Sequence, residues 1–259
     1  MIDTPASLDD TSQVPRKEAL RTYVEQHLQH DNSANILHGG PEVGFILQMV
    51  VRDASPNVLL NVSENNNASY RPMELRLRAL QNDTEYATYA HKPASMQWNE
   101  AAREGFVEMW DIVHRQRELD NQNDTVLIKT LKDPEIRLRA FAIDRLGVGK
   151  VHQAVPALCA IILHESDPAL VFKAIGSLVS IGDSRAVEPL IELAHQKEPT
   201  FVLQVVYAIG TIGGKTAEAY LLTLASGHPV AAVSAGAEDA LTRMHARMQR
   251  SLHDSNKHR

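Results

Sequence analysis

The sequence predicts a mainly α-helical protein whose C-terminal half is an α-solenoid of stacked helical hairpins. Three observations predict this fold: a segment start that recurs four times, an apolar spacing shared by successive segments, and a glycine after most segments. The starts are DPEIRLRA, DPALVFKA, EPTFVLQV and HPVAAVSA, with prolines at Pro134, Pro168, Pro199 and Pro229. These prolines are 34, 31 and 30 residues apart, and a repeat of this length is typical of helical solenoids.

Each recurring start predicts the first turn of a helix. Proline is favoured at the first helical position because its missing N–H would have no partner there, and an Asp before it can cap free amide groups. The first three helices are followed by glycine in the strings DRLG, VSIG and GTIG. We expect Gly147, Gly182 and Gly213 to end these helices in the left-handed conformation, with a second helix a few residues later.

Apolar residues recur at helical spacing in both helices of each hairpin. The central copy has Val171, Ile175, Leu178 and Ile181 at steps of 4, 3 and 3 in its first helix. Its second helix and the other copies repeat the pattern at Ala186, Leu190, Leu193, Ile136, Ala140, Ile143, Leu146, Ala154, Leu158, Ile161, Val202, Val206, Ile209, Ile212, Ala217, Leu221 and Leu224. A lone hairpin cannot bury two such stripes, whereas stacked copies share one continuous core.

The strings DPALVFKAIGSLVSIGDSRAVEPLIELA and EPTFVLQVVYAIGTIGGKTAEAYLLTLA resemble HEAT repeats of the short bacterial type that is also found in phycobilisome lyases. The resemblance covers roughly residues 125–247 and consists of packing and capping residues, so it implies a fold more than a function. The fourth copy, VAAVSAGAEDALTRM, lacks the terminal glycine and a clear partner helix. Such a copy is suited to cap the end of a solenoid.

Along the whole chain we expect four regions. These are a disordered leader over residues 1–14, a mostly helical region over 15–120, the repeat array over 121–247 and a basic tail over 248–259. The leader is polar and acidic without an apolar period, which is typical of disorder.

Within the N-terminal half, helical patterns begin at Pro15 and extend over residues 41–53, 72–90 and 97–119. The apolar runs on either side of DASPN instead allow a small β-hairpin around residues 45–63.

Composition and charge narrow the class of partner. The 26 Lys and Arg residues face 32 Asp and Glu residues, a formal net charge of -6. This balance offers no net attraction for phosphate backbones or anionic lipid, so we expect neither a nucleic-acid nor a membrane partner. The chain starts without a basic and apolar signal, which favours the cytoplasm. The single cysteine, Cys159, lies in the apolar run VPALCAIIL and is expected to be a buried small side chain.

No motif in the sequence predicts a catalytic, cofactor or metal site. The string GTIGGKT has too few residues between its first glycine and the GK pair for a phosphate-binding loop, and it follows a helix, not a strand. His27 and His30 could face one metal from a helix, but a third ligand is missing. The pair His164–Glu165 is similar to the dyads of the deoxyhypusine hydroxylases, whose di-iron site needs several such pairs, and it is the only HE pair in the chain.

We therefore interpret the protein as a non-catalytic scaffold or adaptor that presents its repeats to a protein or peptide. In an array of HEAT geometry the second helices line the concave side, and three rows of side chains there are free of packing. The rows are Gln153, Arg185 and Thr216; Pro156, Glu188 and Ala219; and Ala160, Glu192 and Thr223. The predicted partner-binding residues are Arg185, Glu188, Glu192 and Gln153. The alternative, implied by the resemblance alone, is a bilin lyase-like enzyme component that binds a tetrapyrrole or its carrier protein.

Overall fold

The computed structural model divides the chain into two compact units, residues 1–118 and 119–259. The structure describes residues 2–3, 13–30, 46–53, 73–81, 84–93, 96–195 and 198–257. Among these residues, no helix has the length and apolar character that crossing a membrane requires.

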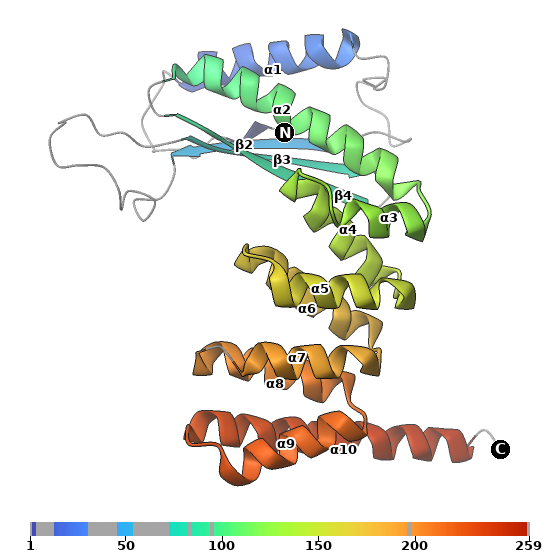
Figure 1. The fold of residues 1–259 in the computed structure, drawn as a ribbon. Helices are drawn as coiled ribbons and strands as arrows, with labels where there is room; N and C mark the ends of the chain where they lie inside the picture. Colours follow the sequence, from blue (N-terminus) through green and yellow to red (C-terminus); the bar gives the residue numbers. More distant parts are fainter. Residues whose placement is uncertain are drawn as a thin grey trace, which may run out of the picture. The chain divides into compact units, whose positions relative to one another are not determined.

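The first unit is a four-stranded sheet with two helices on one of its faces (Figure 1). Its strands are β1 (Ile2–Asp3), β2 (Ile46–Asp53), β3 (Met73–Gln81) and β4 (Thr84–Lys92), in that order across the sheet. Strand β1 pairs with β2 in parallel, and the remaining pairs are antiparallel. The helices are α1 (Gln13–His30) and α2 (Trp98–Asp120).

Alternation along β3 explains why the helices cover only one face of the sheet. Leu75, Leu77 and Ala79 are buried, whereas Arg76 and Arg78 between them are exposed. Side chains of a strand point alternately to its two faces, so an antiparallel sheet can be packed on one side and solvated on the other. A Cβ atom at Gly105 of α2 would lie 2.8 Å from Cδ2 of Leu75, which shows how closely the helix approaches the buried face.

The helices expected over residues 41–53 and 72–90 are wrong: strands β2, β3 and β4 occupy the described parts of these segments. Met, Glu, Leu, Arg and Ala in MELRLRALQ all favour a helix intrinsically. The alternation of apolar and charged residues outweighs that preference because a strand can bury Leu75, Leu77 and Ala79 on the face that α2 covers. The alternative hairpin around residues 45–63 has one strand, β2, in the described part, and β2 pairs with β3.

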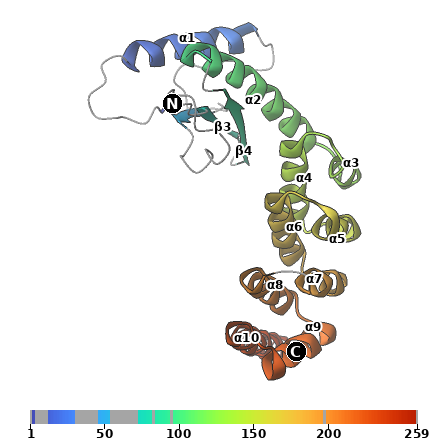
Figure 2. The same cartoon turned by 60° about the vertical axis from the view of Figure 1, so that its left-hand side comes forward.

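The second unit consists of paired helices joined by short turns. The helices are α3 (Asp124–Thr130), α4 (Ile136–Val148), α5 (Val155–His164), α6 (Pro168–Ile181), α7 (Val187–Ala194), α8 (Pro199–Ile212), α9 (Lys215–Gly227) and α10 (Ala231–Lys257). Single 3-10 turns, η2 (His152–Ala154) and η3 (Ser184–Ala186), precede α5 and α7. Figure 2 shows two layers, with α4, α6, α8 and α10 in one and α3, α5, α7 and α9 in the other.

The mainly α fold and the solenoid are confirmed. All seven stripe residues of the central copy are buried in one continuous core that runs through the unit. Toward the ends, Ile136, Ala140, Ile212 and Leu224 are only partly buried. This gradient follows from stacking, because a central hairpin has neighbours on both sides. Cys159 is buried, as expected, and burial raises the pKa of its thiol to about 11.

Two of the four predicted helix starts are confirmed, because α6 and α8 begin at Pro168 and Pro199. The other two are wrong by two residues, since α4 and α10 begin at Ile136 and Ala231. The Asp167 Oδ1 atom accepts a hydrogen bond of 2.8 Å from the Ala169 N–H, with Pro168 in the first turn of α6. Gly182 ends α6 in the left-handed conformation, with φ of 70°, as predicted. The conformation predicted for Gly147 is wrong, because α4 continues through it to Val148 and the positive φ of 50° falls on Lys150.

Gly147 is required for a different reason: it lies at a close contact between α4 and α6. A Cβ atom at this position would lie 2.6 Å from the Ser177 Oγ atom and 2.8 Å from the Ser177 Cα atom. The Ser177 hydroxyl donates a hydrogen bond of 2.8 Å to the Ile143 carbonyl oxygen, which holds the two helices together at this point. Since one of the two opposing atoms belongs to the backbone, side-chain rotation cannot relieve the contact.

Two alanine substitutions in consecutive first helices should therefore have opposite effects. Gly147→Ala should destabilise the unit by about 1–3 kcal/mol through overpacking, more than the gain of about 1 kcal/mol in helix propensity. Gly176→Ala has no atom within 4 Å of its new Cβ, so it should stabilise by up to about 1 kcal/mol. Urea denaturation measures the change in unfolding free energy for each variant. Equal changes in the two variants would contradict the close packing of α4 on α6.

Candidate functional site

The outer face of the second-helix layer carries all nine side chains of the three predicted rows, and every one of them is exposed. They alternate with stripe residues that face the core, such as Leu158, Leu190 and Leu221. In each second helix, one set of side chains packs in the core and another set is exposed to solvent. A partner can therefore bind the exposed set without disturbing the core. Whether these residues bind a partner remains a prediction.

Arg185 is more constrained than its exposed position suggests. Its Nε and Nη2 atoms donate to the Asp183 carboxylate at 3.0 and 2.6 Å, and its Nη2 atom also donates to the His152 carbonyl oxygen at 2.8 Å. The His152 Nδ1 atom lies 3.0 Å from Asp183 Oδ2. Because His152 belongs to the preceding hairpin, Arg185 links two repeats and is not a free cation.

Asp183 is the centre of this network, and the sequence analysis missed it. Its carboxylate also accepts from the Arg185 backbone N–H at 3.0 Å, so it caps η3. Hydrogen bonds from the Arg185 side chain, the Arg185 backbone and His152 lower the pKa of Asp183 below its usual range. An Asp directly after the helix-ending Gly182 is the sequence signal for such a cap.

The lowered pKa predicts how stability depends on pH. The contribution of Asp183 is fully present above the unfolded-state pKa of about 3.9 and is lost as the pH falls through the lower folded-state pKa. Asp183→Asn should therefore melt below the parent at neutral pH, and the difference should shrink below about pH 4. Melting curves across this range measure the difference. Asp239→Asn, which breaks an exposed ion pair with Arg243, should have little effect; a constant difference for Asp183→Asn would contradict this role.

Glu188 and Glu192 are the charged groups of this face that remain available. They lie one turn apart on α7 and are both exposed. Among the interactions of the described residues, neither carboxylate has a hydrogen-bond or ion-pair partner. Two like charges at this spacing repel each other by a few tenths of a kcal/mol. Within the described residues, the outer face of α7 thus presents negative charge that no cation offsets, and Gln153, exposed before α5, adds a neutral amide.

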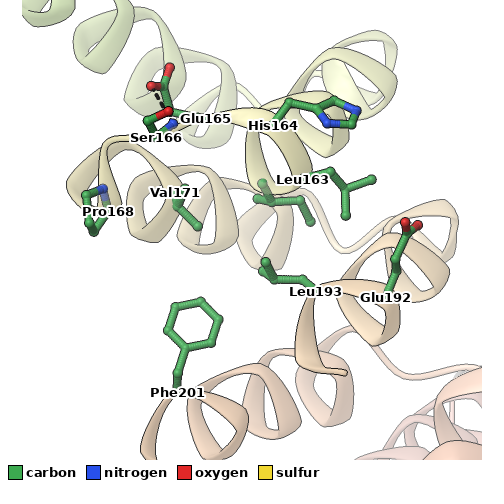
Figure 3. A pocket seen from close by; sticks show the side chains of 10 residues that line it. Leu163, His164, Glu165, Ser166, Pro168, Val171, Glu192, Leu193 and Phe201 are labelled. Carbon is green, nitrogen blue, oxygen red and sulfur yellow. Dashed lines mark hydrogen bonds between the residues drawn. The ribbon is translucent and has the colours of Figure 1, made fainter. Parts of the chain in front are cut away.

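A pocket of about 330 Å³ lies at the end of this face, beside the loops that join successive hairpins (Figure 3). Its lining residues come from four helices and their loops: Ile162, Leu163, His164, Glu165, Ser166, Pro168, Val171, Glu192, Leu193 and Phe201. Figure 3 shows His164 and Glu192 on one side of the pocket and Pro168 and Phe201 on the other. Of the predicted site residues, only Glu192 lines the pocket.

Both members of the His164–Glu165 pair line this pocket. The Glu165 carboxylate accepts hydrogen bonds from the Ser166 and Asp167 N–H groups at 2.9 and 3.1 Å and pairs with Arg139 at 3.2 Å. Glu165 therefore organises the loop between α5 and α6. In the part of the chain that the structure describes, no three His, Cys, Asp or Glu side chains are grouped to hold a metal ion.

The remaining motifs have structural explanations. The string GTIGGKT is the turn between α8 and α9, as predicted, with positive φ at Gly213 and Gly214 and with Lys215 opening α9. His27 packs within the first unit, where its ring lies 6.1 Å from Tyr23 and 5.6 Å from Phe106.

Comparison with known proteins agrees with this architecture. Residues 125–209 match the family model described as HEAT repeats, so this part of the α-solenoid consists of HEAT repeats. A stretch of 75 residues is 40% identical to the bilin biosynthesis protein PecE of Mastigocladus laminosus. This similarity covers 29% of the present chain and 28% of PecE, so the chain spans little more than a quarter of the length of that relative.

Proposed function

We propose that the protein is a non-catalytic scaffold or adaptor that binds a protein or peptide through the outer face of its second-helix layer. The observation that carries this proposal is that all nine side chains of the three predicted rows are exposed on that face. Side chains that do not pack can vary at little cost to the fold and are free to serve recognition. HEAT repeats commonly mediate protein interactions.

The charge of the face favours a partner with basic groups. The array from Asp133 to His228 holds eight Lys and Arg residues against ten Asp and Glu residues, and Arg185 is engaged with Asp183. The free charges of α7 are those of Glu188 and Glu192, which select a partner by complementarity more than by raw affinity. The same balance argues against nucleic acid as the partner. A cytoplasmic location is part of this proposal.

Charge reversal at Glu188→Lys and Glu192→Lys should weaken capture of the partner from lysate while leaving the melting temperature nearly unchanged. Both side chains are exposed, and Arg185 is left intact because its loss would disturb the contact between repeats. The matched control is Glu118→Lys with Glu238→Lys, which changes the net charge equally at exposed positions outside this face. Affinity capture with mass spectrometry measures the difference. Equal capture by both folded double variants would exclude this face.

The second candidate function is a bilin lyase-like component that binds a tetrapyrrole or its carrier protein. The identity to the bilin biosynthesis protein PecE supports it. A visible absorption spectrum recorded after incubation of the chain with a free bilin separates the two candidates. A shifted and enhanced pigment band would favour the lyase-like function, and an unchanged spectrum would favour the scaffold.

A further inference from the structure

The pocket beside α7 combines an apolar wall with one carboxylate that has no partner in the part of the chain that the structure describes. Val171 and Leu193 are buried and form part of the wall, and Pro168 extends it toward the solvent. The Phe201 ring completes the wall, where it packs against Phe172 at a centroid distance of 5.3 Å and an angle of 49°. An aromatic ring held by a second ring presents a defined surface to a ligand.

The two carboxylates that line the pocket differ in their partners. Glu165 is neutralised by Arg139 and by two backbone N–H groups. Glu192 is exposed, and within the described chain its carboxylate has no hydrogen-bond or ion-pair partner. A ligand that enters the pocket therefore meets an apolar, partly aromatic wall, the polar side chains of His164 and Ser166, and one carboxylate that has no partner among the described residues.

The apolar wall and the carboxylate together favour a ligand that has both an apolar part and a positive charge. A carboxylate-bearing ligand would place like charges together, and no Lys or Arg is among the lining residues to offset them. A long cationic side chain can lay its apolar stem along Val171 and Pro168 and keep its charged end at the carboxylate. Arginine suits the site better than lysine because its planar guanidinium both stacks on an aromatic ring and pairs with a carboxylate through two parallel hydrogen bonds.

We propose that this pocket accepts an arginine side chain of the protein partner, with Glu192 as its ion-pair partner and Phe201 as its stacking surface. The inference rests on the proposed function, which brings the partner onto the outer face of α7. It adds to that function a defined anchor, since arginine is among the residue types that contribute most to the binding energy of protein interfaces.

The test uses the full chain with isotope-labelled methyl groups and the probe acetyl-arginine-methylamide. Titration should shift the methyl signals of Leu163, Val171 and Leu193, which line the pocket. The uncharged isostere acetyl-citrulline-methylamide should not shift them. Glu192→Gln should weaken binding of the arginine probe about tenfold, as expected for loss of a charge-assisted hydrogen bond, whereas Glu238→Gln, an exposed change on α10, should leave it unchanged.

Three results would overturn the proposal: no methyl shift with arginine, equal shifts with citrulline, or unaltered arginine binding by folded Glu192→Gln. A stronger response to acetyl-lysine-methylamide would also contradict the assignment to arginine. Because the probe measures occupancy of the pocket directly, failure here is distinct from failure of the proposed function. A chain that captures its partner but leaves the pocket empty contradicts the pocket assignment alone, whereas a chain that captures no partner contradicts the scaffold.

Discussion

The burial of shared apolar stripes between neighbouring hairpins is the interaction on which the second unit depends. Leu178 and Leu190 are each fully buried in the core of the central copy. Burying a side chain of this size contributes about 1.5–3 kcal/mol, and the stripe repeats in every copy. A hairpin on its own would leave one stripe in water, so stacking is a condition of folding. Because stacking uses only the apolar stripes, the outer face of the second helices is available for recognition.

At two places in the stack, a glycine allows the backbones of neighbouring first helices to come close together. Gly147 admits Ser177 of the next first helix, and Gly210 admits Ala240, whose Cβ atom would lie 2.8 Å from a Cβ at that glycine. At the last level, the Arg247 guanidinium donates a hydrogen bond to the Gly210 carbonyl oxygen near the end of α8. The terminal helix α10 thus closes the layer of first helices with both packing and a cation at a helix C-terminus.

The sequence predicted helix boundaries correctly where the capping residues and the apolar periodicity indicate the same boundary. The starts at Pro168 and Pro199 and the glycine stop at Gly182 appear in the structure as predicted. It failed at Gly147, because a glycine before a turn and a glycine at a helix crossing look alike without knowledge of the facing helix. Strand β3 was missed because its residues favour a helix intrinsically. Strand β4 was missed although Thr84, Tyr86, Thr88 and Tyr89 favour a strand.

The candidate site was predictable in outline but not in detail. Exposure of Glu188 and Glu192 follows from helical periodicity alone. The engagement of Arg185 depends on His152, which lies 33 residues earlier in the chain, and no local pattern encodes such a contact. The pocket likewise requires four helices to meet. Its one sequence signal was Phe201, an aromatic residue where the preceding copies have Leu170 and Ile136.

The most direct test of the shared core is Leu178→Asp compared with Ser180→Asp, which is two residues away on the same helix. Leu178 is fully buried, whereas Ser180 is exposed. A buried charge without a partner should cost several kcal/mol and unfold much of the array, so the helical circular dichroism signal should fall sharply for Leu178→Asp and remain near the parent value for Ser180→Asp. Melting of Leu178→Asp at the temperature of the parent would contradict the continuous core.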